Sequence, residues 1–187
     1  MVPMVYLRWM RWGAVALALG AKPDLAQAVT SRVPVKATIQ PPVMPACVSS
    51  PFGPRIMPGR PLAGTFHNGI DMPAPVGSPV DAVAPGTIIR IHRRGAGGLE
   101  ILIQHDGFIG VYSHLGLIAP VLAEGKKTVR GGERIATVGR SGLTYGAHLY
   151  FEMIVSGRPV DPAPYLNVVP CDSDVPAAQN TRMPAQH

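Results

Sequence analysis

Short alternating segments separated by turn residues constrain the fold of this chain more than any other feature of its sequence. Six segments alternate apolar and polar residues as half-buried strands do, at 79–84, 87–93, 99–105, 110–114, 134–138 and 148–155. Turn signals such as Pro85-Gly86 and Gly131-Gly132 separate them. The chain has 21 glycines, 21 prolines and no convincing amphipathic helix, so the sequence predicts a mostly β, antiparallel domain.

The first 28 residues carry the features of an export signal. Arg8 and Arg11 precede an apolar run over residues 12–21, and Ala26 and Ala28 have the small-x-small spacing of a signal-peptidase site. A buried N-terminal helix is the alternative, whereas an apolar run of this length reaches only about half of the bilayer core. We therefore expect a signal peptide over 1–28, an exported protein of the periplasm or cell envelope, and no stable membrane span in the mature chain.

The composition of the remaining residues divides them into a linker, a domain and a tail. Residues 29–46 contain several prolines without a steady period, which predicts an extended Pro-rich linker. Residues 172–187 are polar and have no large apolar cluster, which predicts a flexible tail. A single domain over residues 47–171 remains, and we expect it to be a monomer.

The formal net charge of +6 would fall to +4 on removal of the predicted signal peptide, which carries Arg8, Arg11, Lys22 and Asp24 (6 − 3 + 1). A mildly basic exported domain suits an anionic surface such as a bacterial envelope, although the same charge serves ordinary solubility equally well. The basic residues are scattered and no aromatic residues cluster with them. This pattern argues against a nucleic-acid partner.

Three histidines are candidates for a functional site. His67, His114 and His148 lie at strand edges or in loops among glycines and small residues, and Asp71 follows His67 by four residues. Imidazole and carboxylate are both suitable zinc ligands. On spacing alone, a surface histidine and a surface aspartate explain the pair as well. His105, in I-Q-H-D-G, is interpreted as a structural residue at a turn.

The segment G-A-H-L-Y-F-E-M at 146–153 is more informative. Alternate side chains of a strand share a face, so His148, Tyr150 and Glu152 should project together. The apolar residues between them should face the core. A functional groove explains three polar side chains on one face, and so does a solvated sheet surface.

Seven short motifs follow one another between residues 50 and 166. They are S-P-F-G-P-R at 50–55, H-N-G-I-D-M at 67–72, G-S-P-V-D-A-V-A-P-G-T-I at 77–88, Y-S-H-L at 112–115, G-R-S-G at 139–142, G-A-H-L-Y-F-E at 146–152 and V-D-P-A-P-Y-L at 160–166. In this order and spacing they resemble the lysostaphin/LytM-type family of peptidoglycan endopeptidases, which are zinc metallopeptidases. The resemblance covers essentially the whole domain. It implies a duplicated-hybrid-motif-like antiparallel fold of short strands and long loops.

The resemblance also implies roles for individual residues. His67 and Asp71 correspond to zinc ligands, and His114 and His148 to the two histidines that bind or deprotonate the attacking water and stabilise the oxyanion. A zinc ion polarises the scissile carbonyl and lowers the pKa of bound water, and an imidazole then accepts and returns a proton near neutral pH. The family pattern H-L-H places the third zinc ligand where this chain has Tyr150. A phenolate is able to bind zinc, but its oxygen lies farther from the backbone than an imidazole nitrogen.

Two functions are therefore weighed. The first is an exported zinc-dependent endopeptidase that cuts cross-link or stem peptides of peptidoglycan, with one zinc ion held by His67, Asp71 and either Tyr150 or a neighbouring residue. The second is a degenerate, non-catalytic domain that binds murein or regulates another cell-wall hydrolase. Cys47 and Cys171 lie immediately outside the first and last family motifs. In an exported chain this position predicts a disulfide between them.

Overall fold

The computed structural model describes residues 39–59 and 64–172. All of them belong to one compact unit of the chain, Val33–His187. The predicted signal peptide and most of the predicted tail lie outside the described residues. Within the described ranges, no helix has the length and apolar character needed to cross a membrane.

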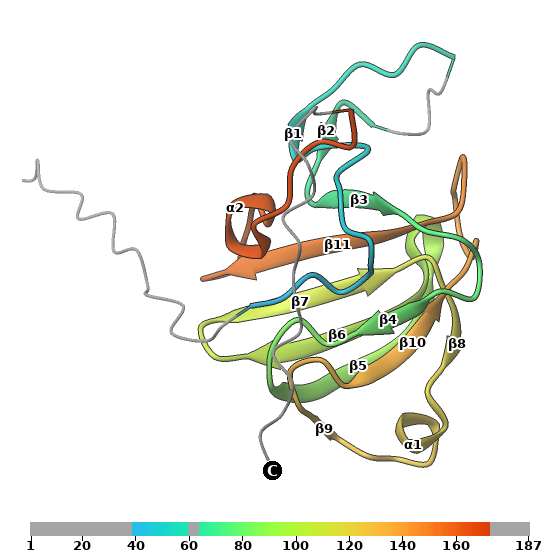
Figure 1. Cartoon of the computed structure of the whole chain (residues 1–187), viewed down its shortest axis with the longest axis vertical. Helices are drawn as coiled ribbons and strands as arrows, with labels where there is room; N and C mark the ends of the chain where they lie inside the picture. Colours follow the sequence, from blue (N-terminus) through green and yellow to red (C-terminus); the bar gives the residue numbers. More distant parts are fainter. Residues whose placement is uncertain (1–38, 60–63, 173–187) are drawn as a thin grey trace, which may run out of the picture. The chain divides into compact units, whose positions relative to one another are not determined.

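The main element of the fold is an antiparallel sheet of seven strands. Two of its long strands, Gly98–His105 and His148–Val155, alternate in burial along most of their length, as the sequence predicts. In sheet order the strands are β12 (Arg158–Val160), β11 (His148–Val155), β7 (Phe108–Ser113), β6 (Gly98–His105), β5 (Gly86–Arg94) and β9 (Thr128–Val129), and β3 (Ile70–Pro73) also pairs with β11. β3 and β12 pair with successive halves of β11, and Figure 1 shows β11 between β3 and β7.

Smaller elements complete the domain. A three-stranded sheet has the order β4 (Pro79–Asp81), β10 (Arg134–Val138) and β8 (Leu115–Ile118), and β1 (Gly53–Pro54) pairs with β2 (Phe66–His67). The 3-10 helix η2 (Gly95–Gly97) joins β5 to β6, and the single-turn helices are α1 (Pro120–Ala123) and α2 (Ala163–Leu166). The mostly β, antiparallel fold class predicted from the sequence is confirmed.

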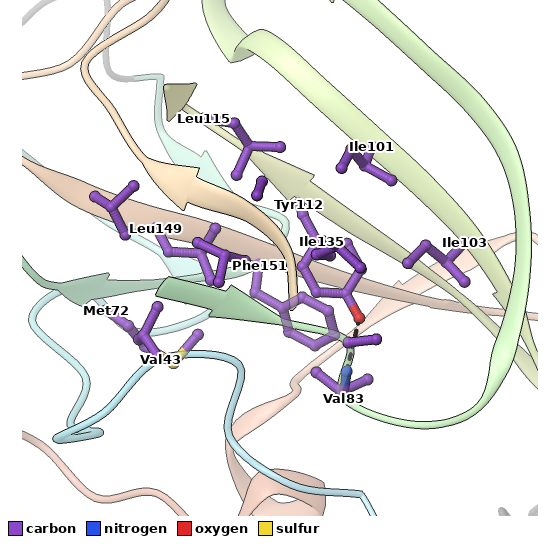
Figure 2. Close-up of a cluster of buried hydrophobic side chains, with 14 of the residues drawn as sticks. Val43, Met72, Val83, Ile101, Ile103, Tyr112, Leu115, Ile135, Leu149 and Phe151 are labelled. Carbon is purple, nitrogen blue, oxygen red and sulfur yellow. Dashed lines mark hydrogen bonds between the residues drawn. The ribbon is translucent and has the colours of Figure 1, made fainter. Parts of the chain in front are cut away.

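The hydrophobic core joins the two larger sheets. Alternate residues of β6, β7 and β11 belong to one cluster with residues of β4, β10 and β8, and Figure 2 shows several of them. At its centre the rings of Tyr112 and Phe151 lie 5.0 Å apart, and the Tyr112 hydroxyl accepts a hydrogen bond of 3.0 Å from the backbone N–H of Val83. Each fully buried large side chain contributes about 1.5–3 kcal/mol relative to an exposed one. The core therefore fixes which face of the large sheet remains available for a site.

The described part of the predicted linker packs on the domain. Val43 is only 2% exposed, and Ile39 packs against the core. The backbone N–H of Gln40 donates to the carbonyl of Val83, and the carbonyl of Pro42 accepts from the N–H of Asp81. Residues 39–46 thus differ from a free linker, because an irregular Pro-rich segment still offers carbonyl acceptors and apolar side chains.

A disulfide joins Cys47 to Cys171, as predicted. The two residues are 124 positions apart in sequence. Beside the bond, Val48 donates its backbone N–H to Val169 and accepts one from Cys171. The two ends of the domain are therefore held together by a covalent bond and by backbone hydrogen bonds.

Candidate active site

The face of the large sheet opposite the core forms the floor of a groove. Alternation along the central strands turns one set of side chains away from the core, including Glu100, Ser113, Tyr150 and Glu152. Loops around η2, after β1 and before β11 form its walls, and the groove has a volume of about 810 Å³. The predicted face of β11 is confirmed, because the intervening Leu149, Phe151 and Met153 are buried.

His67 and Asp71 meet at one end of this groove. His67 ends β2 and Asp71 lies in β3, and the glycine between them allows close approach, since a Cβ on Gly69 would fall on the carbonyl oxygen of Phe151. The Nε2 atom of His67 is 3.2 Å from Oδ1 of Asp71. Burial by itself would raise the pKa of Asp71, but the hydrogen bond from His67 and the nearby positive charges outweigh it and lower that pKa. Asp71 is therefore ionised at neutral pH.

His148 reaches the same carboxylate from β11. Its Nε2 atom is 3.4 Å from Oδ1 of Asp71, and its Nδ1 atom is 3.0 Å from the carbonyl oxygen of Gly146. The register of β11 against β3 pairs His148 with Pro73 and Tyr150 with Asp71. The antiparallel pairing of these two strands thus gathers residues that are almost 80 positions apart in sequence.

His114 stands beside His148. It follows the last residue of β7 and has φ 63°, a left-handed conformation that is uncommon for a residue other than glycine. Its backbone N–H and carbonyl are both bonded, to Gly97 and Gly139, and its Nδ1 is 2.9 Å from the carbonyl oxygen of Ser141. The rings of His114 and His148 lie 4.7 Å apart. Burial lowers the pKa of His114, so its imidazole is neutral at pH 7.

The three histidines have the same orientation toward the backbone. The Nδ1 atoms of His67, His114 and His148 each lie 2.9–3.0 Å from a carbonyl oxygen, on Pro51, Ser141 and Gly146 respectively. Because a carbonyl only accepts, each Nδ1 is the donor in its bond, and Nε2 is the ring nitrogen left for other contacts. The Nε2 atoms of His67 and His148 both lie near Oδ1 of Asp71, at 3.2 and 3.4 Å, within reach of a hydrogen bond to the carboxylate.

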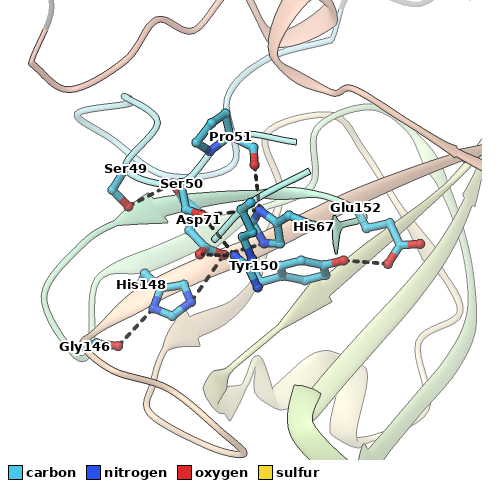
Figure 3. Close-up of polar contacts among 10 residues, drawn as sticks. Ser49, Ser50, Pro51, His67, Asp71, Gly146, His148, Tyr150 and Glu152 are labelled. Carbon is cyan, nitrogen blue, oxygen red and sulfur yellow. Dashed lines mark hydrogen bonds and ion pairs between the residues drawn. The ribbon is translucent and has the colours of Figure 1, made fainter. Parts of the chain in front are cut away.

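Tyr150 lies among these residues, but its hydroxyl points elsewhere. The phenol donates a 2.8 Å hydrogen bond to Oε2 of Glu152, and Figure 3 shows it directed along β11, away from Asp71 and His148. The Tyr150 ring lies 5.3 Å from that of His67. Burial, followed by the charge of Glu152, raises the pKa of Tyr150 well above its ordinary value. All five predicted site residues line one groove, but in this structure the Tyr150 oxygen does not face the His67–Asp71 pair.

Several participants were missed by sequence reasoning. Arg55 places Nη1 3.9 Å from Oδ2 of Asp71 and donates to Ser50. Glu100 accepts from the Ser113 hydroxyl at 2.8 Å and lies 3.0 Å from Nε2 of His92. Arg55 belongs to the motif S-P-F-G-P-R, which was the available signal. The carbonyls that orient the histidines have no signal in the sequence, because every residue has one.

Fold and groove define a peptidase-like domain, and comparison with known proteins identifies the class. The model of peptidase family M23 matches residues 65–162. Over 118 residues the chain is 42% identical to DD-carboxypeptidase/endopeptidase Mpg of Neisseria meningitidis, covering 62% of this chain and 26% of that protein. Over 115 residues it is 35% identical to peptidoglycan DD-endopeptidase ShyA of Vibrio cholerae, covering 61% and 26%. The chain thus spans about a quarter of the length of these relatives.

Solved structures agree with this result. A zinc-containing peptidase from Vibrio cholerae superposes with a TM-score of 0.58 at 30% identity, covering 75% of this chain and 41% of that one. The catalytic domain of lysostaphin from Staphylococcus simulans gives a TM-score of 0.56 at 26% identity, covering 65% and 92%. The chain belongs to peptidase family M23, and the predicted lysostaphin-type fold is confirmed.

The family implies zinc, and the donor set can be tested for it. His67 and Asp71 fit, because their facing atoms are 3.2 Å apart and the donors of a tetrahedral zinc site with bonds of 2.0–2.1 Å are roughly 3.3 Å apart. A third donor is not in place. Among residues 39–59 and 64–172, no three His, Cys, Asp or Glu side chains form a ready metal-binding group.

Proposed function

We propose that this chain is an exported, zinc-dependent endopeptidase that cuts cross-link or stem peptides of peptidoglycan. The single observation that carries the proposal is the convergence of His67, Asp71 and His148 in the groove, with His114 beside them. Export rests on the predicted signal peptide, and the substrate class rests on relatives named as peptidoglycan endopeptidases. The disulfide is consistent with an oxidising compartment.

The residues of the groove have separate tasks in this proposal. His67 and Asp71 would hold the zinc ion, with Tyr150 predicted as third ligand, and the bound metal supplies a Lewis acid for the peptide carbonyl. His114 and His148 are the predicted proton-transfer residues. His114 suits this task, because its pKa is lowered and its Nδ1–H is already bonded, so the Nε2 lone pair is free to accept a proton.

The remaining polar side chains would orient the substrate. Arg55 lies near Oδ2 of Asp71, the oxygen that the histidines do not contact, and the charge on its guanidinium favours the ionised carboxylate. The groove has a volume of about 810 Å³ and would hold part of a stem peptide.

Purified chain incubated with insoluble peptidoglycan tests the proposal. Zinc-loaded protein should release soluble fragments, chelator-treated protein should not, and added zinc should restore the release. His114→Gln should reduce release by at least about 100-fold, since general-base catalysis contributes roughly 10²–10⁴-fold. Tyr165→Phe is the control variant, because Tyr165 is exposed and lies outside the lining of the groove. Zinc-loaded protein that releases no soluble fragments would contradict the proposal that this chain is an endopeptidase.

The second candidate is a non-catalytic murein-binding or regulatory domain. The commitment of the Tyr150 hydroxyl to Glu152 favours it, because only two of the predicted ligands then face each other. This reading predicts that the chain sediments with peptidoglycan without cleaving it, whether or not zinc is present. The same incubation separates the two functions.

A further inference from the structure

We propose that Ser141 is a positioning residue that sets the His114 imidazole for proton transfer. The proposal rests on the proposed function, in which His114 moves the proton. Ser141 belongs to the motif G-R-S-G at 139–142, none of whose residues lines the groove. Its effect on the reaction would therefore pass through His114 and not through contact with the substrate.

The Ser141 hydroxyl joins two strands that are distant from it in sequence. It accepts a 2.8 Å hydrogen bond from the backbone N–H of Leu99 and donates one of 2.8 Å to the carbonyl oxygen of Leu115. Leu99 lies in β6, and Leu115 begins β8. A hydroxyl has one proton to donate and also accepts, so this side chain is bonded in both directions. The two bonds fix residues 139–142 against both strands.

The backbone carbonyl of the same residue orients His114. Nδ1 of His114 is 2.9 Å from the carbonyl oxygen of Ser141, and a carbonyl only accepts, so Nδ1–H is the donor. The hydrogen bond made by one ring nitrogen of a neutral histidine sets which nitrogen carries the proton, and here it leaves Nε2 as the acceptor. Because the hydroxyl and the carbonyl belong to one residue, the hydroxyl bonds also hold the acceptor of His114 in place.

The backbone of His114 is bound to the same segments. His114 has φ 63°, its N–H donates to the carbonyl of Gly97, and its carbonyl accepts from the N–H of Gly139. A Cβ on Gly98 would fall on the carbonyl carbon of Ser141, so the start of β6 and residues 139–142 are in close contact. A left-handed backbone at a residue other than glycine persists only where the surrounding structure holds it. Ser141 is part of that surrounding structure.

Removal of the hydroxyl should therefore act on the rate of the reaction and not on substrate binding. Ser141→Ala leaves every side chain that lines the groove in place but loosens the carbonyl that orients His114. Because a misplacement of about 1 Å costs up to about 100-fold in rate, the maximal rate of fragment release should fall by about 10–100-fold. The half-saturating amount of peptidoglycan should change by less than about threefold. Ser141→Thr keeps a hydroxyl and should stay within about threefold of wild type in rate.

Imidazole nitrogen NMR of the full chain supplies a readout that does not depend on activity. Wild-type His114 should carry its proton on Nδ1, whereas Ser141→Ala should show a mixture of the two tautomers. Thr137→Ala is the matched control, because the Thr137 hydroxyl also accepts a backbone N–H of β8, that of Leu117 at 3.0 Å, and lies outside the lining of the groove. This control should match wild type in both the tautomer and the rate. Circular dichroism and the melting temperature show whether each variant folds.

Several results would overturn the proposal. A wild-type His114 with its proton on Nε2 would do so without any variant, even if Ser141→Ala does not fold. With an active wild type, an unchanged tautomer or an unchanged rate in folded Ser141→Ala would do so too, as would an equal loss of rate in Thr137→Ala. An inactive zinc-loaded wild type, with the His114 tautomer still changed in Ser141→Ala, would refute the endopeptidase and leave the orientation of His114 by Ser141 standing.

Discussion

Removal of the Cys47–Cys171 disulfide should destabilise the domain strongly. The bond closes a loop of 124 residues, for which the chain-entropy relation gives about 5 kcal/mol at 25 °C. For a domain of roughly 130 residues, in which 1 kcal/mol corresponds to about 3–4 °C, the melting temperature should fall by about 15–20 °C. Thermal and urea unfolding of the Cys47→Ser/Cys171→Ser double variant measure this difference.

The same variant should also affect the groove. The segment that follows Cys47 bonds to Asp71 through Ser49 N–H and Ser50 O, and Pro51 O accepts from His67. Loosening this segment should therefore weaken zinc binding even at temperatures where the variant is folded. Wild type in a reductant that breaks the bond is the matched comparison. A fall of less than about 3 °C in the double variant would refute the loop-closure reasoning.

Three further predictions concern the core and the edges of the domain. Gly69→Ala should cost about 1–3 kcal/mol in unfolding free energy, since its Cβ meets the Phe151 carbonyl, whereas Gly146→Ala, with open space around it, should cost less than about 0.5 kcal/mol. Equal losses of stability in the two variants would contradict the close approach of Gly69 to Phe151. Burial lowers the pKa of His105, so the folded state binds its proton less readily than the unfolded state and stability should fall as the pH drops below about 6.5. The loss of stability between pH 7 and 5 should be smaller in His105→Gln than in wild type, and the same pH dependence in both proteins would contradict this role of His105. Starting the chain at residue 39 should preserve the melting temperature, whereas starting it at 47 should lower the free energy of unfolding by at least about 1.5–3 kcal/mol because Val43 is buried. Equal stability of the two shortened chains would show that residues 39–46 do not stabilise the domain.

The sequence predicts those parts of the fold that repeat with a period. The alternation at 148–155 gives both the strand and the direction of each side chain, and the structure has that strand with the same bounds. Strands of two to four residues, such as β2 and β3, are too short for any period to be recognised. His105 is buried and bonded to the Pro85 carbonyl, in agreement with its interpretation as a structural residue.

Features that depend on tertiary contacts were not predictable. The direction of the Tyr150 hydroxyl depends on Glu152 and on the crowding around Asp71. The left-handed backbone of His114 depends on hydrogen bonds to Gly97 and Gly139, which come from loops distant in sequence. Residues 39–46 lack a pattern because they pack as an irregular segment with bends at 42–45, where neither a helical nor a strand period applies. Positions of side chains in the candidate site thus required the structure.

Release of soluble peptide fragments from peptidoglycan by zinc-loaded wild type and by zinc-loaded His114→Gln is the most direct test of the central claim. Both proteins carry the metal, so the comparison isolates the chemistry of the groove from metal binding. The account predicts steady release by wild type and at least about a 100-fold lower rate for His114→Gln. Equal rates for the two proteins, or no release by wild type with zinc bound, would contradict it.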